Sequence, residues 1–134
     1  MVTSISAPAT FEGTVEVYSF VEQILEDHDV PPKTITHINI ALDEAVSNVV
    51  RYAYDGGDGD YKVTVEVDEH LVRIEIRDRG FAYNPLETKD PDIHSPLEER
   101  KIGGYGIFMI KNLVSDVLYR RENDENVLTL LMKF

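Results

Sequence analysis

The sequence predicts an α+β fold, a two-layer sandwich in which helices cover one face of a mixed, mostly antiparallel sheet. In two segments before residue 55, apolar residues recur every three or four positions, which is typical of amphipathic helices. After residue 60, apolar and polar residues alternate over 61–67 and 72–76, as in strands with one buried face. Because only a short link joins these two segments, they are expected to form an antiparallel hairpin.

Composition limits the classes of protein to which the chain can belong. The 134 residues are 43% hydrophobic and 28% charged, with no Cys and a formal net charge of −12, which predicts one domain over 1–134. No stretch approaches the ~18 apolar residues of a membrane span, and no leader pattern opens the chain, so we expect a cytoplasmic protein without a membrane partner. The acidic balance also disfavours direct contact with nucleic acid, which is bound through Lys and Arg.

The first half of the chain is expected to hold one strand and two helices. Residues 2–6 could form a short strand, and 14–28 and 34–54 carry the helical periodicity, with Pro31 and Pro32 between them. A cluster of Asp and Gly over 55–60 predicts a turn.

The second half is expected to complete the sheet around a long loop. Strands at 61–67 and 72–76 precede a segment over 80–103 that lacks periodicity and contains three prolines. A loop of that length in a compact domain is usually functional, often as a lid. A third helix over about 104–114 and strands at 117–121 and 126–134 follow.

Polar side chains gather on one side of the second predicted helix. Helical spacing places Glu44, Asn48, Arg51 and His37 within a narrow arc opposite the apolar face. This arc could simply be the solvated back of an amphipathic helix. A carboxylate and a carboxamide at i and i+4 also point the same way, and such oxygens suit a hard cation such as Mg²⁺.

A second motif lies where the second hairpin strand ends, at Asp78-Arg79-Gly80. Glycine lets the backbone approach a ligand closely, and the neighbouring carboxylate can accept a hydrogen bond from an amino group such as that of adenine. A plain turn would use the same residues.

The third motif is the glycine-rich segment from Lys101 to Gly106. Glycines that run into a helix N-terminus leave backbone N–H groups free to bind an anion, and Lys101 adds positive charge. A Rossmann finger fails on context because it requires a parallel βαβ unit. A flexible hinge that caps the helix remains the alternative.

These motifs in this order resemble the N box and the two G boxes of the GHKL (Bergerat-fold) ATP-binding superfamily. Within it, the chain is most similar to the stand-alone anti-sigma-factor serine kinases. The matching segments are Glu44-Ala45-Val46-Ser47-Asn48, Asp78-Arg79-Gly80-Phe81-Ala82-Tyr83-Asn84-Pro85 and Gly103-Gly104-Tyr105-Gly106.

The resemblance implies a role for each matching residue. Glu44 would be the general base, Asn48 would hold Mg²⁺, and Asp78 would bind the adenine amine of ATP beside Gly80 and Ala82. The segment over about 84–102 would be the ATP lid. The phosphates would be bound by Arg51, Lys101, Gly103, Gly104, Tyr105 and Gly106.

Two positions depart from the family pattern. A basic His commonly ends the N box, but Tyr52 stands there, so the resemblance leaves Arg51 to supply the cation. Ala82 replaces a second glycine of the first G box, and subfamilies of these kinases tolerate a small residue there.

Three hypotheses about function follow from the resemblance and its departures. The first is an ATP- and Mg²⁺-dependent serine kinase that phosphorylates a STAS-type anti-anti-sigma protein and sequesters a sigma factor, possibly as a homodimer. The second is a module that binds nucleotide without transferring phosphate, which Tyr52 favours. The third is a detached histidine-kinase-type catalytic domain.

Overall fold

The structure is a computed structural model and describes residues 2–87 and 105–134. A five-stranded sheet in the order β1-β2-β3-β5-β4 forms one layer, and every neighbouring pair of strands is antiparallel. The α+β sandwich is therefore confirmed, with antiparallel pairing throughout the described strands where a mixed sheet was expected. The strands are β1 (Val2–Pro8), β2 (Asp60–Asp68), β3 (Leu71–Asp78), β4 (Asp116–Glu122) and β5 (Glu125–Lys133).

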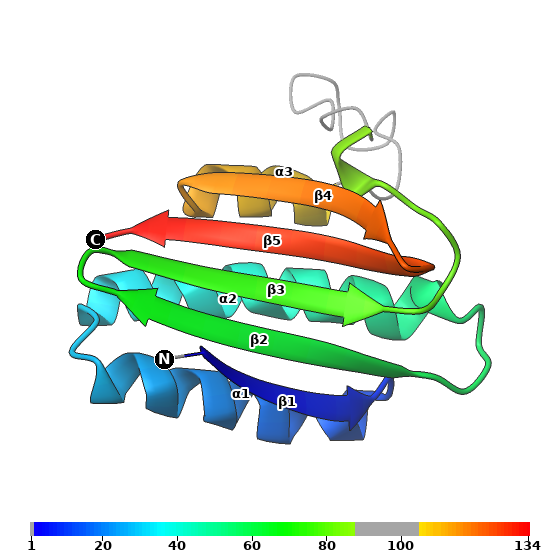
Figure 1. Cartoon of the computed structure of the whole chain (residues 1–134), viewed down its shortest axis with the longest axis horizontal. Helices are drawn as coiled ribbons and strands as arrows, with labels where there is room; N and C mark the ends of the chain where they lie inside the picture. The colour runs from blue at the N-terminus through cyan, green and yellow to red at the C-terminus, as the bar shows by residue number, and fades with distance from the viewer. Residues whose placement is uncertain (1, 88–104) are drawn as a thin grey trace, which may run out of the picture.

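The helices form the second layer and cover only one face of the sheet (Figure 1). α1 lies behind β1, α2 behind the middle of the sheet and α3 behind β4 (Figure 1). Within the described residues, no helix is long and apolar enough to cross a membrane. The helical elements are α1 (Phe11–Asp27), α2 (Pro32–Asn48), the π-helical turn η1 (Val49–Ala53), the 3₁₀ turn η2 (Pro85–Glu87) and α3 (Tyr105–Leu113).

Local chemistry explains where the first two helices depart from their predicted bounds. α1 begins at Phe11, before the expected residue 14, because the Thr10 hydroxyl accepts a hydrogen bond from the Gly13 amide at 3.1 Å and caps the helix. Pro32 opens α2 at a first-turn position, where its missing N–H costs nothing. The α-helix then ends at Asn48, and the expected continuation to residue 54 is a π-turn.

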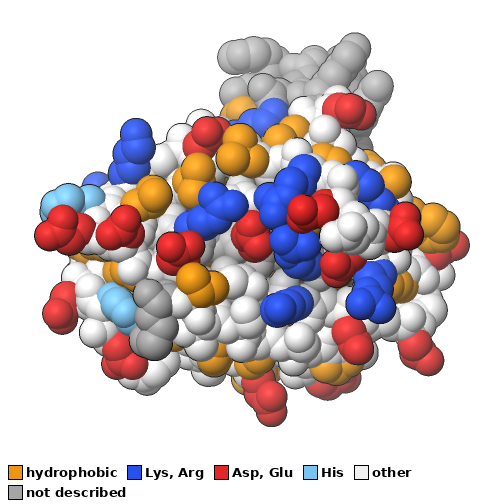
Figure 2. Space-filling view, in the orientation of Figure 1, with side chains coloured by type: hydrophobic (Ala, Val, Ile, Leu, Met, Phe, Trp, Pro, Cys, Tyr) orange, Lys and Arg blue, Asp and Glu red, His pale blue; other side chains and the backbone are white. Residues whose placement is uncertain are grey.

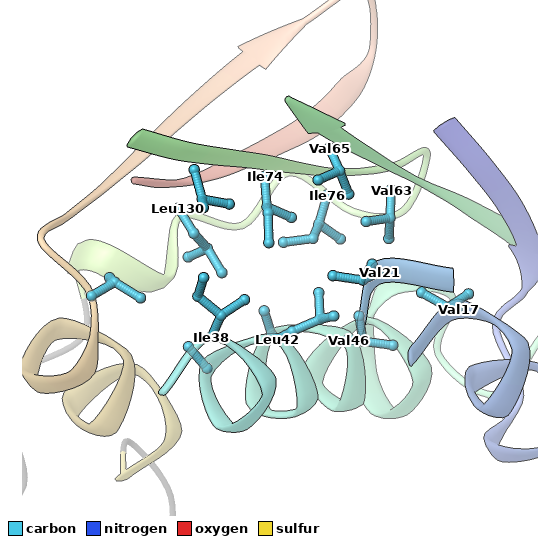
Figure 3. Packing of buried hydrophobic residues seen from close by; sticks show 14 of the residues in the cluster. Val17, Val21, Ile38, Leu42, Val46, Val63, Val65, Ile74, Ile76 and Leu130 are labelled. Carbon is cyan, nitrogen blue, oxygen red and sulfur yellow. The ribbon is translucent and has the colours of Figure 1, made fainter. Parts of the chain in front are cut away.

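The core lies between the two layers (Figure 3). Val17 and Val21 point from α1, and Leu42 and Val46 from α2, toward strand side chains such as Ile74 (Figure 3). All five are at most 1% exposed. The apolar period of the helices and the alternation of the strands therefore both face this layer, as the sequence pattern predicts.

The opposite face of the sheet carries an ion-pair network centred on Glu75. Its carboxylate accepts hydrogen bonds from Arg73 at 3.0 Å and Arg120 at 3.2 Å, and Arg77 lies 3.5 Å away. Figure 2 shows basic and acidic side chains side by side across this face. Burial would raise the pKa of Glu75, but the bonds from Arg73 and Arg120 and the charge of Arg77 lower it below its usual value.

Candidate functional site

A cavity of about 420 Å³ opens between the end of α2, α3 and the sheet. Its volume falls within the roughly 300–1,000 Å³ of typical small-molecule sites. Ile76, Ile107, Ile110 and Leu128 give it apolar walls from both layers. The polar and aromatic lining comprises Asn48, Tyr52, Asp78, Phe81, Tyr83, Tyr119 and Asn126.

Asp78 lines one wall of this cavity, and the residue is only 7% exposed. It is the last residue of β3, so the inward side of the strand places it next to the apolar wall. Its Oδ1 accepts hydrogen bonds from the Gly80 amide and from Asn126 Nδ2, each at 2.9 Å. No described residue donates to Oδ2, which is therefore available to a ligand that carries an N–H donor.

Gly80 lets the segment after β3 pack closely against η1. A Cβ at this position would stand 2.0 Å from the Ala53 carbonyl oxygen, which is too close for any residue other than glycine. That same oxygen accepts a hydrogen bond from the Phe81 amide at 3.1 Å. The sequence predicts that the backbone at Gly80 approaches a ligand, but in the structure it approaches the backbone of Ala53. Ala53 and Phe81 line the cavity at this contact.

Glu44 and Asn48 meet the first turn of α3. A Cβ on Gly106 would lie 2.8 Å from Glu44 Oε2 and 3.8 Å from Asn48 Nδ2. The two side chains therefore point the same way, as their i, i+4 spacing predicts. Asn48 lines the cavity, whereas Glu44 lies outside its lining, beside Gly106.

The π-turn η1 decides which side chain after Asn48 reaches the cavity. A π-turn advances less per residue than the about 100° of an α-helix, so Tyr52 returns toward the face of Asn48 and Arg51 turns away from it. Tyr52 lines the cavity, whereas the Arg51 guanidinium lies 5.8 Å from the ring centroid of Phe11. Regular helical spacing placed Arg51 in the arc of Glu44 and Asn48, and the structure does not.

Tyr54 ties the end of β3 to the start of β2. Its hydroxyl donates to the Asp60 carbonyl and accepts from the Arg79 amide at 2.9 Å. Gly59 makes room for the ring, because a Cβ there would stand 2.3 Å from it. Burial is the main cause that raises the pKa of Tyr54, so the hydroxyl remains a donor.

The structure brings most of the described candidate residues together, but not all of them. Asn48, Asp78 and Ala82 line one cavity. Gly80 packs against Ala53, and Gly106 lies beside Glu44 and Asn48, so these residues contact ones that line the cavity without being in its lining themselves. Lys101, Gly103, Gly104 and most of the expected lid over 84–102 lie outside the described residues, and of Tyr105 only the backbone at the start of α3 is described.

Sequence reasoning missed Asn126, Tyr54 and Tyr119. Their roles depend on contacts with residues 6 to 48 positions away, which no local pattern encodes. No local signal marked Asn126, because it follows the polar run over 120–125 and stands at the first position of the strand expected over 126–134.

Comparison with known proteins gives the same assignment as the motifs. Residues 7–132 match the model of the histidine kinase-like ATPase domain. A serine-protein kinase RsbW of Listeria monocytogenes is 34% identical over 110 residues, covering 76% of this chain and 67% of the relative. An anti-sigma F factor of Bacillus velezensis is 29% identical over 104 residues, covering 77% of this chain and 68% of the relative.

A solved structure shares the fold. The crystal structure of the RsbU and RsbW domains of Rv1364c from Mycobacterium tuberculosis aligns with a TM-score of 0.70 at 20% identity. The alignment covers 98% of this chain and 32% of that one. The order of the motifs and these matches agree: the chain belongs to the histidine kinase-like ATPase family and resembles its anti-sigma-factor kinases.

Proposed function

We propose that the chain is an ATP-dependent serine protein kinase. The observation that carries the proposal is one cavity with two separate polar ends. Asp78 supplies an acceptor at one wall, and Asn48 with the nearby Glu44 supplies oxygen groups near α3. Relatives named as serine-protein kinases support this choice.

Adenine would be recognised in the apolar part of the cavity. Ile76 and Leu128 offer flat apolar contact, and Asp78 Oδ2 would accept a hydrogen bond from the exocyclic amine. The glycines of the third motif and Lys101 would bind the phosphates, and the segment over 84–102 would close over them, as the family resemblance implies.

The donor set at the end of α2 suits Mg²⁺. The amide oxygen of Asn48 is a hard, neutral ligand of the kind that Mg²⁺ accepts alongside water and substrate phosphate. When bound, the ion would neutralise charge on the phosphates of ATP. Glu44 lies one helical turn away from Asn48 on the same face and remains free to act on a proton.

Glu44 would act as the general base of the transfer. As the serine Oγ of the acceptor forms a bond to the γ-phosphorus, the bond from that phosphorus to the β–γ bridging oxygen breaks and ADP leaves. The serine proton passes to the Glu44 carboxylate. The carboxylate is half-buried and lies beside Gly106 in the first turn of α3, close to where the phosphates would lie.

The acceptor would be a serine on a STAS-type anti-anti-sigma protein, and the kinase would also sequester a sigma factor. Relatives named RsbW and anti-sigma F factor support this partner class. A homodimer is part of the same proposal, by resemblance to the family.

Transfer from radiolabelled ATP tests the proposal against its alternatives. The protein is incubated with Mg²⁺ and with candidate STAS-type or histidine-containing proteins, and the labelled residue is identified by its acid and base stability. Phosphoserine supports the kinase, and phosphohistidine would support a detached histidine-kinase-type domain. Tight nucleotide binding without transfer would support the non-catalytic module, which the presence of Tyr52 in place of the usual basic residue favours.

A further inference from the structure

Asn126 lines the cavity but has no hydrogen-bonding capacity left for a ligand. Its Nδ2 donates to Asp78 Oδ1 at 2.9 Å and to the Phe81 carbonyl at 2.6 Å. Its Oδ1 accepts from the Tyr83 amide at 3.2 Å and from the Tyr119 hydroxyl at 2.6 Å. A carboxamide has two N–H donors and two acceptor lone pairs, and all four are used within the protein.

These four bonds also fix which way the amide faces. If the Asn126 amide were flipped, its oxygen would face Asp78 Oδ1 and the Phe81 carbonyl oxygen. Three hydrogen-bond acceptors would then lie together with no donor between them. The side chain is 7% exposed, and water could not relieve that conflict cheaply. Asn126 is therefore held as a donor toward Asp78.

The carboxylate of Asp78 is fixed in turn. Oδ1 receives two donors, one from the Gly80 amide and one from Asn126, which hold the plane of the carboxylate. Oδ2 then faces the ligand as an acceptor only. A purine amino group satisfies this oxygen, and a purine carbonyl at the same position would be repelled by it.

We infer that Asn126 is a positioning residue that gives Asp78 its selectivity for the amino group of adenine, with Tyr119 holding Asn126 in place. The inference rests on the proposed function, because it requires that Asp78 binds adenine. Without the hydrogen bond from Asn126, the Asp78 carboxylate would rotate toward water, and Oδ2 would lose its preference for an N–H donor on the purine ring.

The inference is tested with a ligand that lacks the exocyclic amino group of adenine. Calorimetry compares ADP with purine riboside 5′-diphosphate, which lacks only the exocyclic amine, for the parent and for three variants. In the parent we expect ADP to bind on the order of tenfold more tightly. Asn126→Leu should bring the two affinities to within about twofold, and Tyr119→Phe should give an intermediate ratio.

Thr129→Val is the matched control, because it changes a 1% exposed side chain on the same strand whose hydroxyl has no partner within the described part of the chain. Its ratio of affinities for the two ligands should equal that of the parent.

A merely structural role for Asn126 would lower the melting temperature of Asn126→Leu and leave its ratio of affinities unchanged. That result would overturn the inference alone. A parent that does not distinguish the two ligands would overturn the proposed adenine recognition as well. If Asn126→Leu does not fold, Tyr119→Phe decides, and an unchanged ratio in that variant refutes the inference.

Discussion

Glu44 and Asp43 are neighbours in sequence that face different surroundings. Glu44 lies beside Gly106 at the first turn of α3, whereas Asp43 accepts a hydrogen bond from the Tyr18 hydroxyl at 2.8 Å. This difference of one helical step allows a matched pair of substitutions to separate catalysis from binding.

Glu44→Gln should reduce the rate of phosphate transfer by a factor on the order of 10² or more, because it removes the basic carboxylate and keeps the shape. Nucleotide affinity should stay close to that of the parent. Transfer rates and affinities are measured separately with the same acceptor protein. Asp43→Asn should transfer phosphate at the parent rate, and a Glu44→Gln protein that did so would remove Glu44 from the mechanism.

Among the described glycines, Gly80 has the least room for a side chain. Gly80→Ala should lower the free energy of unfolding by about 3 kcal/mol, because a Cβ there would overlap backbone atoms of Ala53 that cannot move aside alone. Urea denaturation measures the loss. Gly57→Ala, where the nearest atom would be 3.1 Å away, should cost clearly less. Equal costs would mean that the contact with Ala53 relaxes easily.

Among the elements, the π-turn η1 has the greatest effect on the cavity. An i→i+5 turn places one extra residue in the helix, and such turns occur often at functional sites. Here it moves Arg51 out of the arc that regular spacing predicts and puts the Ala53 carbonyl where Gly80 and Phe81 meet it. Hydrophobic periodicity cannot detect this insertion, because Val49 and Ala53 continue the apolar pattern of α2 through the π-turn.

Tyr52→Ala should weaken ADP binding several-fold, because it removes an aromatic side chain from the cavity wall. Arg51→Ala should change the affinity by less than about twofold, since its guanidinium lies over Phe11 instead. Calorimetry with ADP in the absence of metal measures both. A larger loss for Arg51→Ala would mean that the guanidinium leaves Phe11 for the phosphates when nucleotide binds.

The elements themselves were predictable to different degrees. The hairpin of β2 and β3 follows directly from alternation around a short link. The order β1-β2-β3-β5-β4 does not, because β1 pairs with β2 across more than fifty residues and nothing local specifies that partner. The pairing of Asp78 with Asn126 in β5 depends on the same long-range register, and this is why the polar partner of Asp78 was missed.

For the whole molecule, the network on the open face of the sheet makes stability depend on pH. The pKa of Glu75 is lower in the folded chain than its ordinary value of about 4.5. A carboxyl with a lowered pKa stabilises the fold above the unfolded value, and that contribution is lost as the pH falls through the folded value.

Glu75→Gln should therefore lower the free energy of unfolding at pH 7 by about 1 kcal/mol, and the difference from the parent should shrink toward pH 3. Urea denaturation across this pH range measures it. Glu69→Gln, in the exposed turn between β2 and β3, is the matched control and should leave the free energy of unfolding at pH 7 close to that of the parent. A difference for Glu75→Gln that persisted at pH 3 would have a cause other than ionisation.

The two layers also differ in charge. α1 contains five acidic residues and no basic one, whereas the open face of the sheet sets arginines against glutamates. Within the described residues, negative charge is therefore concentrated along α1, behind β1 (Figure 1). The field of this helix would turn an approaching macromolecule before any contact forms, and a second acidic molecule would meet the sheet face at lower electrostatic cost than α1. Added salt would weaken this rotation first, at distances beyond about 10 Å, and leave the paired charges of the sheet largely unaffected.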